Sequence, residues 1–153
     1  MKITDVCAKA EVPVVVLPVV EVDYKILTRK NFWFSWQQEK KMTVYKLMLE
    51  GSSEILGAMS IDFIGPESRV HIDLLATSRS NIGLNKKYSG IAGCLIAYAC
   101  RQAMVRYAEP CVSLIPKTTL KSYYMNEFGM LEAGKCVCLF EDGMIELILK
   151  HEV

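Results

Sequence analysis

The sequence predicts a single mixed α/β domain of the α+β kind, spanning residues 1–153, with a mostly antiparallel sheet flanked by helices. Three observations support this prediction: a succession of short apolar segments before residue 78, a glycine-rich turn that leads into a long apolar helix, and a second helical segment set between further strands. A chain of 153 residues is long enough to bury one core.

The first half of the chain is expected to be largely extended. The apolar run 12–22 contains Pro13 and Pro18, which favour an edge strand or an irregular segment over a central strand. Residues 31–36 place aromatic side chains beside small polar ones and predict a strand or a strand end. Apolar runs between turn signals predict three consecutive antiparallel strands, at 43–49, 55–64 and 69–77.

The segment from Lys87 to Gly93 (Lys-Tyr-Ser-Gly-Ile-Ala-Gly) is the most informative part of the sequence. It lies between the strand predicted at 69–77 and a helix that the apolar spacing predicts over 91–104, with a buried strand at 110–115 after it. The first-turn amides of a helix lack intrahelical partners and carry partial positive charge, and glycines let the backbone approach a ligand. We therefore predict a phosphate-binding turn here.

Two common nucleotide-binding turns do not fit this segment. A Walker A loop ends in Gly-Lys-Ser/Thr, whereas here Gly93 is followed by Cys94. A dinucleotide-binding fold places G-x-G-x-x-G directly after its first strand, whereas this turn lies past the middle of the chain and follows a polar loop. Neither type of nucleotide site is predicted.

The last third of the chain is expected to hold one more helix and a hairpin. Thr118 or Thr119 is expected to cap a helix that runs to Phe128 and ends at Gly129. An Asp-Gly pair favours a tight turn between two strands, which predicts a closing hairpin formed by residues 135–140 and 144–149.

Composition limits the partners that are expected. Lys and Arg exceed Asp and Glu by one, 18 against 17, without a basic stripe, so no nucleic-acid partner is predicted. No apolar run reaches the ~20 residues of a membrane-spanning helix, and the N-terminal residues lack a signal-peptide pattern. We therefore predict a cytoplasmic protein without a membrane partner, and a homodimer is left open.

The cysteines predict neither a metal site nor disulfides. They lack C-x-x-C spacing and nearby histidines, so no metal is expected. Buried free thiols of a reducing compartment are the expected state. The alternative is a nucleophilic Cys94, because a helix N-terminus lowers the pKa of a thiol. The six cysteines are Cys7, Cys94, Cys100, Cys111, Cys136 and Cys138.

The order of strand, glycine turn, helix, strand and aromatic helix end resembles the GCN5-related N-acetyltransferase (GNAT) family, most strongly over residues 44–149. That family's pyrophosphate motif is Q/R-x-x-G-x-G/A, and the residues from Lys87 to Ala92 fit it with lysine in the first place. A second family signature, F-Y-x-K-x-G-F, is matched loosely by Tyr124 to Met130. The resemblance implies a GNAT-like sheet that splays between its fourth and fifth strands.

The resemblance also implies acetyl-CoA as a cosubstrate, with its pantetheine arm in the gap between the splayed strands. By resemblance, the backbone of Leu75, Ala76 and Thr77 pairs with that arm like an added strand. By resemblance, the glycine turn holds the pyrophosphate through residues Lys87, Tyr88, Ser89, Gly90, Ile91, Ala92 and Gly93.

Acyl transfer from a thioester to an amine needs a base for the amine and an acid for the departing thiolate. His71 and Asp73 alternate along the strand 69–77, so both are expected on one face just before the splay, acting directly or through water. The alternative is structural: a strand-end hydrogen bond for His71 and a surface ion pair for Asp73. By resemblance Tyr124 is the acid, and because Tyr123 lies about 100° away on a helix, at most one of the two is expected to face the cleft.

The sequence therefore predicts an acetyl-CoA-dependent N-acetyltransferase that acetylates a primary amine, on a small molecule or a peptide, by direct attack in a ternary complex. The alternative is a non-catalytic acyl-CoA-binding or regulatory module of the same layout. Acceptor specificity is expected in the first third and in loops. That third carries four aromatic residues, for which core positions are more usual than pocket positions: Phe32, Trp33, Phe34 and Trp36.

Overall fold

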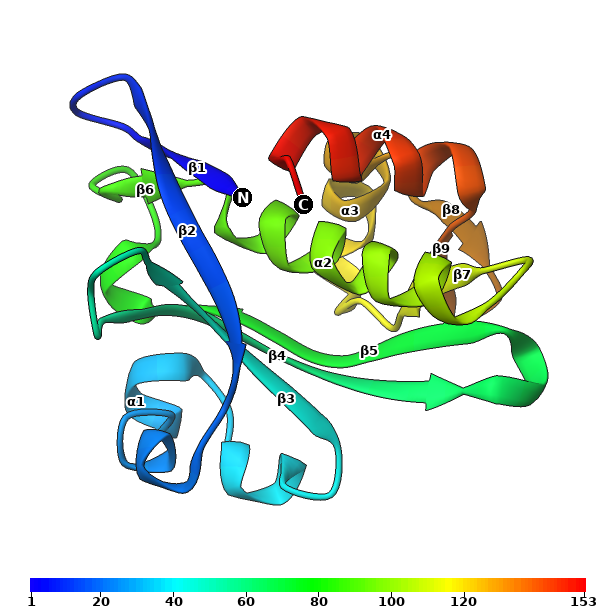
Figure 1. Cartoon of the computed structure of the whole chain (residues 1–153), viewed down its shortest axis with the longest axis horizontal. Helices are drawn as coiled ribbons and strands as arrows, with labels where there is room; N and C mark the ends of the chain where they lie inside the picture. Colours follow the sequence, from blue (N-terminus) through cyan, green and yellow to red (C-terminus); the bar gives the residue numbers. More distant parts are fainter.

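One curled sheet organises the molecule. In the computed structural model, which describes residues 1–153, nine strands lie in the order β6-β1-β2-β3-β4-β5-β7-β9-β8 (Figure 1). The strands are β1 (Lys2–Asp5), β2 (Ala10–Pro18), β3 (Thr43–Leu49), β4 (Ile55–Ile64), β5 (Arg69–Thr77), β6 (Tyr88–Ser89), β7 (Cys111–Leu114), β8 (Leu131–Ala133) and β9 (Cys136–Leu139). The helices are α1 (Arg29–Phe32), α2 (Ile91–Arg106), α3 (Lys121–Phe128) and α4 (Glu141–His151). The predicted α+β class with a mostly antiparallel sheet is confirmed.

The two faces of the sheet are covered unequally. Helices α2, α3 and α4 lie on one side of the strands and α1 lies on the other (Figure 1). α2 packs against both the sheet and α4, and its small buried residues, such as Ala97 and Ala99, allow this close approach. A core of 27 buried residues fills this side, whereas a smaller core of 7 buried residues, including Phe32 and Trp36, lies under α1.

β5 and β7 run parallel and then separate. Their pairing begins at Arg69 with Cys111 and ends at Ile72 with Leu114, after which β5 continues to Thr77 while β7 stops. Beyond Ile72, β5 therefore has a partner strand on one side only. The predicted splay of the sheet is confirmed, and it lies between β5 and β7, because β4 pairs along the whole length of β5.

A β-bulge between β4 and β5 lies at the point where β5 separates from β7. β4 pairs Ile61 with Ile72 and the preceding Ser60 with Leu74, so Asp73 is the extra residue. The extra residue reverses the alternation of the strand, because Ile72 belongs to the large core whereas Leu74 packs against the smaller one. Nothing in the local sequence pattern indicates this reversal.

β2 is the segment that was predicted to be an edge. It is internal, between β1 and β3, so that prediction is wrong. Its residues 10–13 pair only with β1, however, and its residues 14–18 pair only with β3. Each half of β2 is open along one side, and Pro13 and Pro18 are tolerated because a proline has no N–H to leave unpaired there.

Residues 31–36 do not form a strand, so that prediction is also wrong. They run from the end of α1 into the 3-10 helix Trp36–Glu39. Phe32 and Trp36 lie four residues apart and are both buried, and the Trp36 indole donates a hydrogen bond to the Phe32 carbonyl at 3.0 Å. The chain turns sharply at Trp33, which has a φ of 71°, so the end of α1 and the start of the 3-10 helix place both rings in the smaller core.

The predicted closing hairpin is wrong as well. The C-terminal hairpin is formed by β8 and β9 around Gly134, which has a φ of 61°, and the last segment is helix α4. The buried residues of α4 are Met144, Leu147 and His151, at the spacing of one helical face. Two acidic residues in its first turn favour a helix N-terminus, so the Asp-Gly pair starts a helix here.

The helix predicted to end at Phe128 does end there, with Gly129 at a φ of 67°. Its start differs from the prediction, because Thr118–Leu120 form a 3-10 turn and α3 begins at Lys121 without a side-chain cap. No helix of the structure is both long enough and apolar enough to cross a bilayer.

Candidate active site

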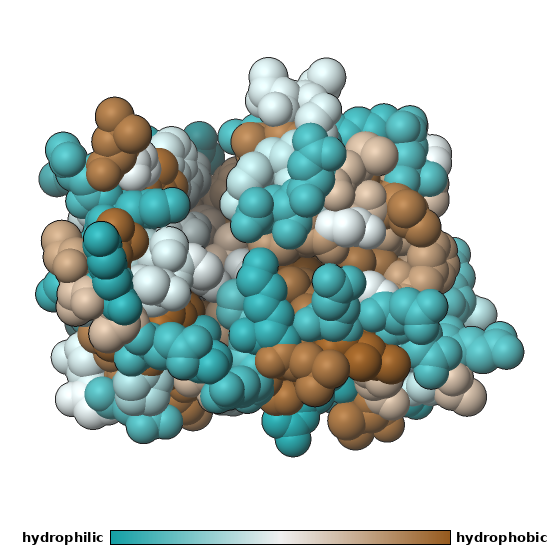
Figure 2. Space-filling view, turned by 90° about the horizontal axis from the view of Figure 1, so that it is seen from above, coloured by the Kyte–Doolittle hydropathy of each residue, from teal (hydrophilic) through white to brown (hydrophobic).

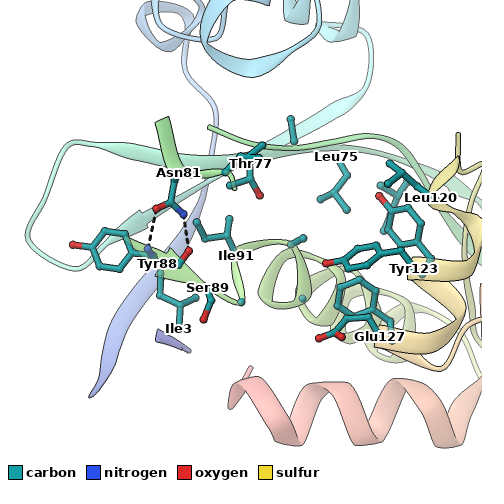
Figure 3. A pocket seen from close by; sticks show the side chains of 18 of the residues that line it. Ile3, Leu75, Thr77, Asn81, Tyr88, Ser89, Ile91, Leu120, Tyr123 and Glu127 are labelled. Carbon is teal, nitrogen blue, oxygen red and sulfur yellow. Dashed lines mark hydrogen bonds between the residues drawn. The ribbon is translucent and has the colours of Figure 1, made fainter. Parts of the chain in front are cut away.

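The gap between β5 and β7 opens into a cleft of about 950 Å³. Seen from above, the surface of the molecule is hollowed between its two halves (Figure 2). In the close-up, Leu75 and Thr77 of β5 form one wall, Ile91 of α2 lies opposite, and Tyr123 and Glu127 of α3 close one end (Figure 3). The cleft is therefore built from the strand, the helix start and the aromatic segment that carry the family resemblance.

The edge of β5 presents backbone groups to the cleft. The N–H of Ser78 donates to Leu56 and the N–H of Leu74 donates to the Ser60 hydroxyl, so both point toward β4. Because backbone N–H groups alternate along a strand, Ala76 also points toward β4. The backbone groups of the intervening residues, Leu75 and Thr77, point into the gap, where the Thr77 carbonyl already accepts a hydrogen bond from the Trp33 indole. Of the three residues predicted to pair with a ligand arm, two thus present their backbone to the cleft.

The glycine turn is held in place by one buried side chain. Asn81 is 5% exposed, accepts hydrogen bonds from the amides of Lys87 and Tyr88 at 2.9 and 2.8 Å, and donates to the Tyr88 carbonyl at 2.7 Å (Figure 3). β6 also pairs with β1, so Ser89 faces Thr4. Asn81 was not predicted as a site residue, because an asparagine in a polar loop carries no signal of burial.

The glycine turn leads into α2, whose uncapped N-terminus lines the cleft. Gly90 precedes α2 with a φ of 94°, a left-handed conformation that favours glycine, and no side chain caps this end. The amides of the first turn, from Ile91 to Gly93, therefore have no intrahelical partner and lie at the positive end of the helix dipole. All three of these residues line the cleft.

Basic side chains lie near this helix end. Lys86 and Lys150 line the cleft, whereas Lys87, whose amide was predicted to hold the pyrophosphate, does not. Its amide donates to Asn81 and its side chain lies over the Tyr88 ring. Gly93 has a packing role as well, because a Cβ there would lie 2.6 Å from Nε2 of His151. Burial lowers the pKa of His151, so its imidazole is neutral at pH 7.

Tyr123 and Tyr124 both line the cleft, so the expectation that at most one would face it is wrong. Their rings form an edge-to-face pair, with centroids 5.6 Å apart, and both contact Phe128. Burial, followed by the neighbouring Tyr123, raises the pKa of the Tyr124 hydroxyl above its usual value. Tyr124 therefore stays protonated at neutral pH and is a hydrogen-bond donor.

The two predicted base candidates lie in different surroundings. Asp73 lines the cleft at the bulge. His71 lies before the divergence, where its Nδ1 is 2.8 Å from the Ser113 hydroxyl and 3.2 Å from the Arg69 guanidinium, and it does not line the cleft. Burial first, and Arg69 second, lower the pKa of His71.

The four aromatic residues of the first third divide in an unexpected way. Phe32 and Trp36 are core residues, as such side chains usually are, but Trp33 and Phe34 line the cleft. Trp33 has a φ of 71° and is the centre of a tight turn in which the Phe34 amide donates to the Phe32 carbonyl. Its indole donates to the Thr77 carbonyl at 2.9 Å, and the Arg79 guanidinium stacks on the ring at 3.7 Å.

A thiol nucleophile does not fit this site. Cys94 is fully buried and is not among the residues that line the cleft. Burial raises the pKa of its thiol to about 11, so the thiol is protonated at neutral pH.

Comparison with known proteins identifies solved structures of the same shape. No protein-family model and no curated protein matches the chain. The structure is similar to AtaTR bound with AcCoA, with a TM-score of 0.61, 15% identity, and coverage of 89% of this chain and 98% of that one. It is also similar to the KacTA–DNA complex, with a TM-score of 0.60, 12% identity, and coverage of 90% and 99%.

A third similar structure is AtaT complexed with acetyl-methionyl-tRNAfMet, with a TM-score of 0.55, 14% identity, and coverage of 89% and 99%. Two of these three structures hold a nucleic acid, which does not fit the expectation of no nucleic-acid partner. At these identities the likeness establishes the fold alone. The chain has the fold of the GCN5-related N-acetyltransferases.

Proposed function

We propose that this protein is an acetyl-CoA-dependent N-acetyltransferase. The observation that supports this most is the meeting, in one cleft, of an unpaired strand edge and an uncapped helix N-terminus. An extended arm that carries amide groups pairs with such an edge, and a pyrophosphate suits such a helix end. Coenzyme A contains both groups in one molecule.

In this proposal each part of the cleft has one task. The amides from Ile91 to Gly93 hold the pyrophosphate, with Lys86 and Lys150 nearby. Leu75 and Thr77 pair with the pantetheine arm through the backbone groups that point into the gap. An arm held in this way runs along β5 toward the bulge, so the reacting end lies beside Asp73.

The thioester supplies an acetyl group for direct attack by an amine. The amine must first lose a proton, and Asp73, which lines the cleft, is better placed to take it than His71, whose ring contacts Ser113 and Arg69. Tyr124, kept protonated by burial, donates a proton or hydrogen bond to the departing thiolate. The departing coenzyme then leaves as a neutral thiol.

Coenzyme binding is tested by thermal unfolding with and without acetyl-CoA, using Ala92→Asp. A carboxylate in the first turn of α2 favours the helix but repels a pyrophosphate, so this variant is expected to fold well and to lose the shift in Tm. Ala92→Asn is the matched control of similar size and should keep the shift. Absence of stabilisation of the wild type at saturating acetyl-CoA would refute the proposal.

Transfer is tested by the release of coenzyme A thiol in the presence of amines. A protein that binds acetyl-CoA but releases no thiol with any of a panel of small amines, peptides and aminoacyl-tRNAs would be the non-catalytic module. Thiol release that requires the amine, and that substitutions in the cleft reduce, supports the transferase.

The acceptor side of the cleft favours an amine carried by a polyanion, specifically an RNA. All five exposed charged side chains between residues 25 and 41 are basic: Lys25, Arg29, Lys30, Lys40 and Lys41. The same segment contains Trp33 and Phe34, which line the cleft, and the exposed stack of Arg79 on Trp33 is a suitable platform for a base. An AtaT structure of the same fold holds an acylated tRNA. We therefore propose aminoacyl-tRNA as the acceptor class, ahead of a free small molecule or a peptide.

Charge reversal of α1 tests this acceptor class. The double variant Arg29→Glu with Lys30→Glu should bind a tRNA mixture more weakly. The slope of the logarithm of the binding constant against the logarithm of the salt concentration should fall by about one for each phosphate that the protein no longer neutralises. Lys9→Glu with Lys135→Glu changes the net charge equally at exposed positions on other elements and should bind like the wild type. Transfer to a lysine peptide but not to aminoacyl-tRNA would return the acceptor to the peptide class.

A further inference from the structure

The last residue of α4 is a histidine that lies buried beside the glycine turn. His151 is only 6% exposed, and it lines the cleft. A Cβ added at Gly90 would lie 3.5 Å from Cε1 of His151, and one added at Gly93 would lie 2.6 Å from its Nε2. The imidazole is therefore packed against both glycines that enclose the first turn of α2.

The fold leaves the ring nitrogens of His151 without a partner. No hydrogen bond of good geometry involves this side chain, although the Lys2 backbone lies near enough to favour the protonated ring. No fully buried polar side-chain atom of the protein lacks a partner, so these nitrogens are accessible, and the residue opens on the cleft. A buried ring with free nitrogens thus lies beside the free amides of a helix N-terminus.

The two ends of the chain meet at this place (Figure 1). β1 pairs with β6 of the glycine turn, and Lys2 forms ion pairs of 2.7 Å with Glu11 of β2 and with Glu152, which follows His151. In the close-up, Ile3 of β1 and Ser89 of β6 lie at the end of the cleft away from α3 (Figure 3). These contacts hold the end of α4 beside the turn where the pyrophosphate is proposed to bind.

The surroundings of His151 favour a neutral ring in the free protein. Burial lowers the pKa of His151 most, the Lys2 backbone opposes this, and Lys150 lowers the pKa further. No carboxylate forms an ion pair with the ring, so a bound phosphate would be its first anionic partner. β6 and the first turn of α2 contribute no charged side chain. The other charged groups that line the cleft or flank the ring are Lys2, Glu11, Lys86, Glu127, Glu152 and the chain ends at Met1 and Val153.

We propose that His151 is a phosphate-binding residue of the coenzyme site, and that its ring takes up a proton from solvent when the pyrophosphate binds. The phosphates are expected at the first turn of α2, against which the ring packs, and the imidazolium donates to a phosphate oxygen that the helix amides leave free. The C-terminal end of α4 also favours a positive charge on this ring. The inference rests on the proposed binding of acetyl-CoA but not on acetyl transfer.

Proton uptake makes coenzyme affinity depend on pH. A phosphate within a few ångströms raises the pKa of an imidazole by about 1–3 units, so the complex binds more protons than the free protein near pH 7. Affinity is therefore highest in mild acid and falls as pH rises through the raised pKa, by about tenfold for each unit of difference. His151 was not predicted as a site residue, because a histidine between Lys150 and Glu152 is typical of an exposed chain end.

Imidazole titration by NMR, with and without saturating acetyl-CoA, tests this inference in the wild type. The chain has only two histidines, and His71 does not line the cleft, so it is an internal reference. His151 should titrate below 6.5 in the free protein, and acetyl-CoA should raise its midpoint by about one unit or more while that of His71 stays in place. A His151 midpoint that acetyl-CoA leaves unchanged or lowers would overturn the inference.

Titration calorimetry in buffers of different ionisation enthalpy counts the protons that acetyl-CoA binding takes up. His151→Gln, which can still donate a hydrogen bond but does not titrate, should take up fewer protons than the wild type and bind about tenfold more weakly at pH 6, with a smaller difference at pH 8. His71→Gln is the matched control and should behave like the wild type.

The coenzyme itself needs a control, because its 3′-phosphate has a second pKa of about 6 and can exchange protons in the same range. The comparison is therefore repeated with the 3′-dephospho form of acetyl-CoA, and the difference between the wild type and His151→Gln should persist. Equal proton uptake by the two proteins overturns the role of His151 alone. No binding of acetyl-CoA by the wild type between pH 6 and 8 overturns it together with the proposed function.

Discussion

The two walls of the cleft differ in how they depend on the sequence. The donor wall, residues 73–77 and 87–93, uses local features: a strand end, a glycine at positive φ and a helix start. The acceptor wall, residues 32–39, depends on which of its four aromatic side chains the rest of the fold buries. Local signals are readable in sequence and burial partners are not, so the strand and the helix of the donor wall were predicted, whereas the acceptor wall was mistaken for a strand.

The largest expected effect is the difference in stability loss between substitutions of the two tryptophans of the acceptor wall. Trp36 is fully buried and donates to the Phe32 carbonyl, so Trp36→Ala should destabilise the protein by about 3–5 kcal/mol. Trp33 is 36% exposed, so Trp33→Ala should cost about 1 kcal/mol or less in stability but should reduce transfer. Urea unfolding and thiol release measure the two quantities. Equal losses of stability would show that Trp33 is a core residue and not a part of the site.

The next effect concerns the two tyrosines that share the cleft. Tyr124→Phe removes the proposed proton donor and should lower kcat about 100-fold, with little change in the shift of Tm by acetyl-CoA. Tyr123→Phe is the matched control, since Tyr123 is more exposed and its ring contacts would remain. If the control reduced activity as much as Tyr124→Phe, the acid role would belong to the pair or to Tyr123.

What could be predicted from the sequence follows the same contrast between local and distant interactions. The strands at 43–49, 55–64 and 69–77 and the helix after Gly90 were predicted because turns and periodicity mark them locally. The bulge at Asp73 was not, since a one-residue mismatch is a property of two strands together. The burial of Asn81 and of Glu39 was missed for the same reason: each is buried by contacts with residues distant in the chain. The C-terminal helix was missed because its Asp-Gly pair also suits a hairpin.

A smaller effect distinguishes backbone strain from ligand binding on the donor wall. Gly90 and Gly51 have φ values of 94° and 75°, and an added Cβ has no close contact at either position. Both Gly90→Ala and Gly51→Ala should therefore cost about 1–2 kcal/mol in stability. Only Gly90→Ala should also weaken acetyl-CoA binding, by about tenfold, because it shifts the amides that face the phosphate. Titration calorimetry with acetyl-CoA checks this, and equal affinity in the two variants would remove Gly90 from the phosphate site.

The smallest expected effect is on the pH dependence of the free energy of unfolding. The contribution of a carboxyl group should change with pH in opposite directions at the two walls. Burial, followed by Asp73, raises the pKa of Glu39 in the fold, so folding favours the protonated form of this carboxyl. Its contribution is fully present below the ordinary value of 4.5 and is lost as pH rises through the raised value. Glu39→Gln should therefore gain stability relative to the wild type as pH increases across that window.

Glu152, beside the donor wall, provides the opposite case. Hydrogen bonding to Lys2 lowers the pKa of this exposed carboxyl, so its contribution is present above its ordinary value of 4.5 and is lost as pH falls through the lowered one. Glu152→Gln should therefore lose stability relative to the wild type at neutral pH and match it in acid. Urea unfolding of both variants across pH measures the two slopes. Slopes of the same sign would mean that the fold does not raise the pKa of Glu39, and the contrast between the two walls would then fail.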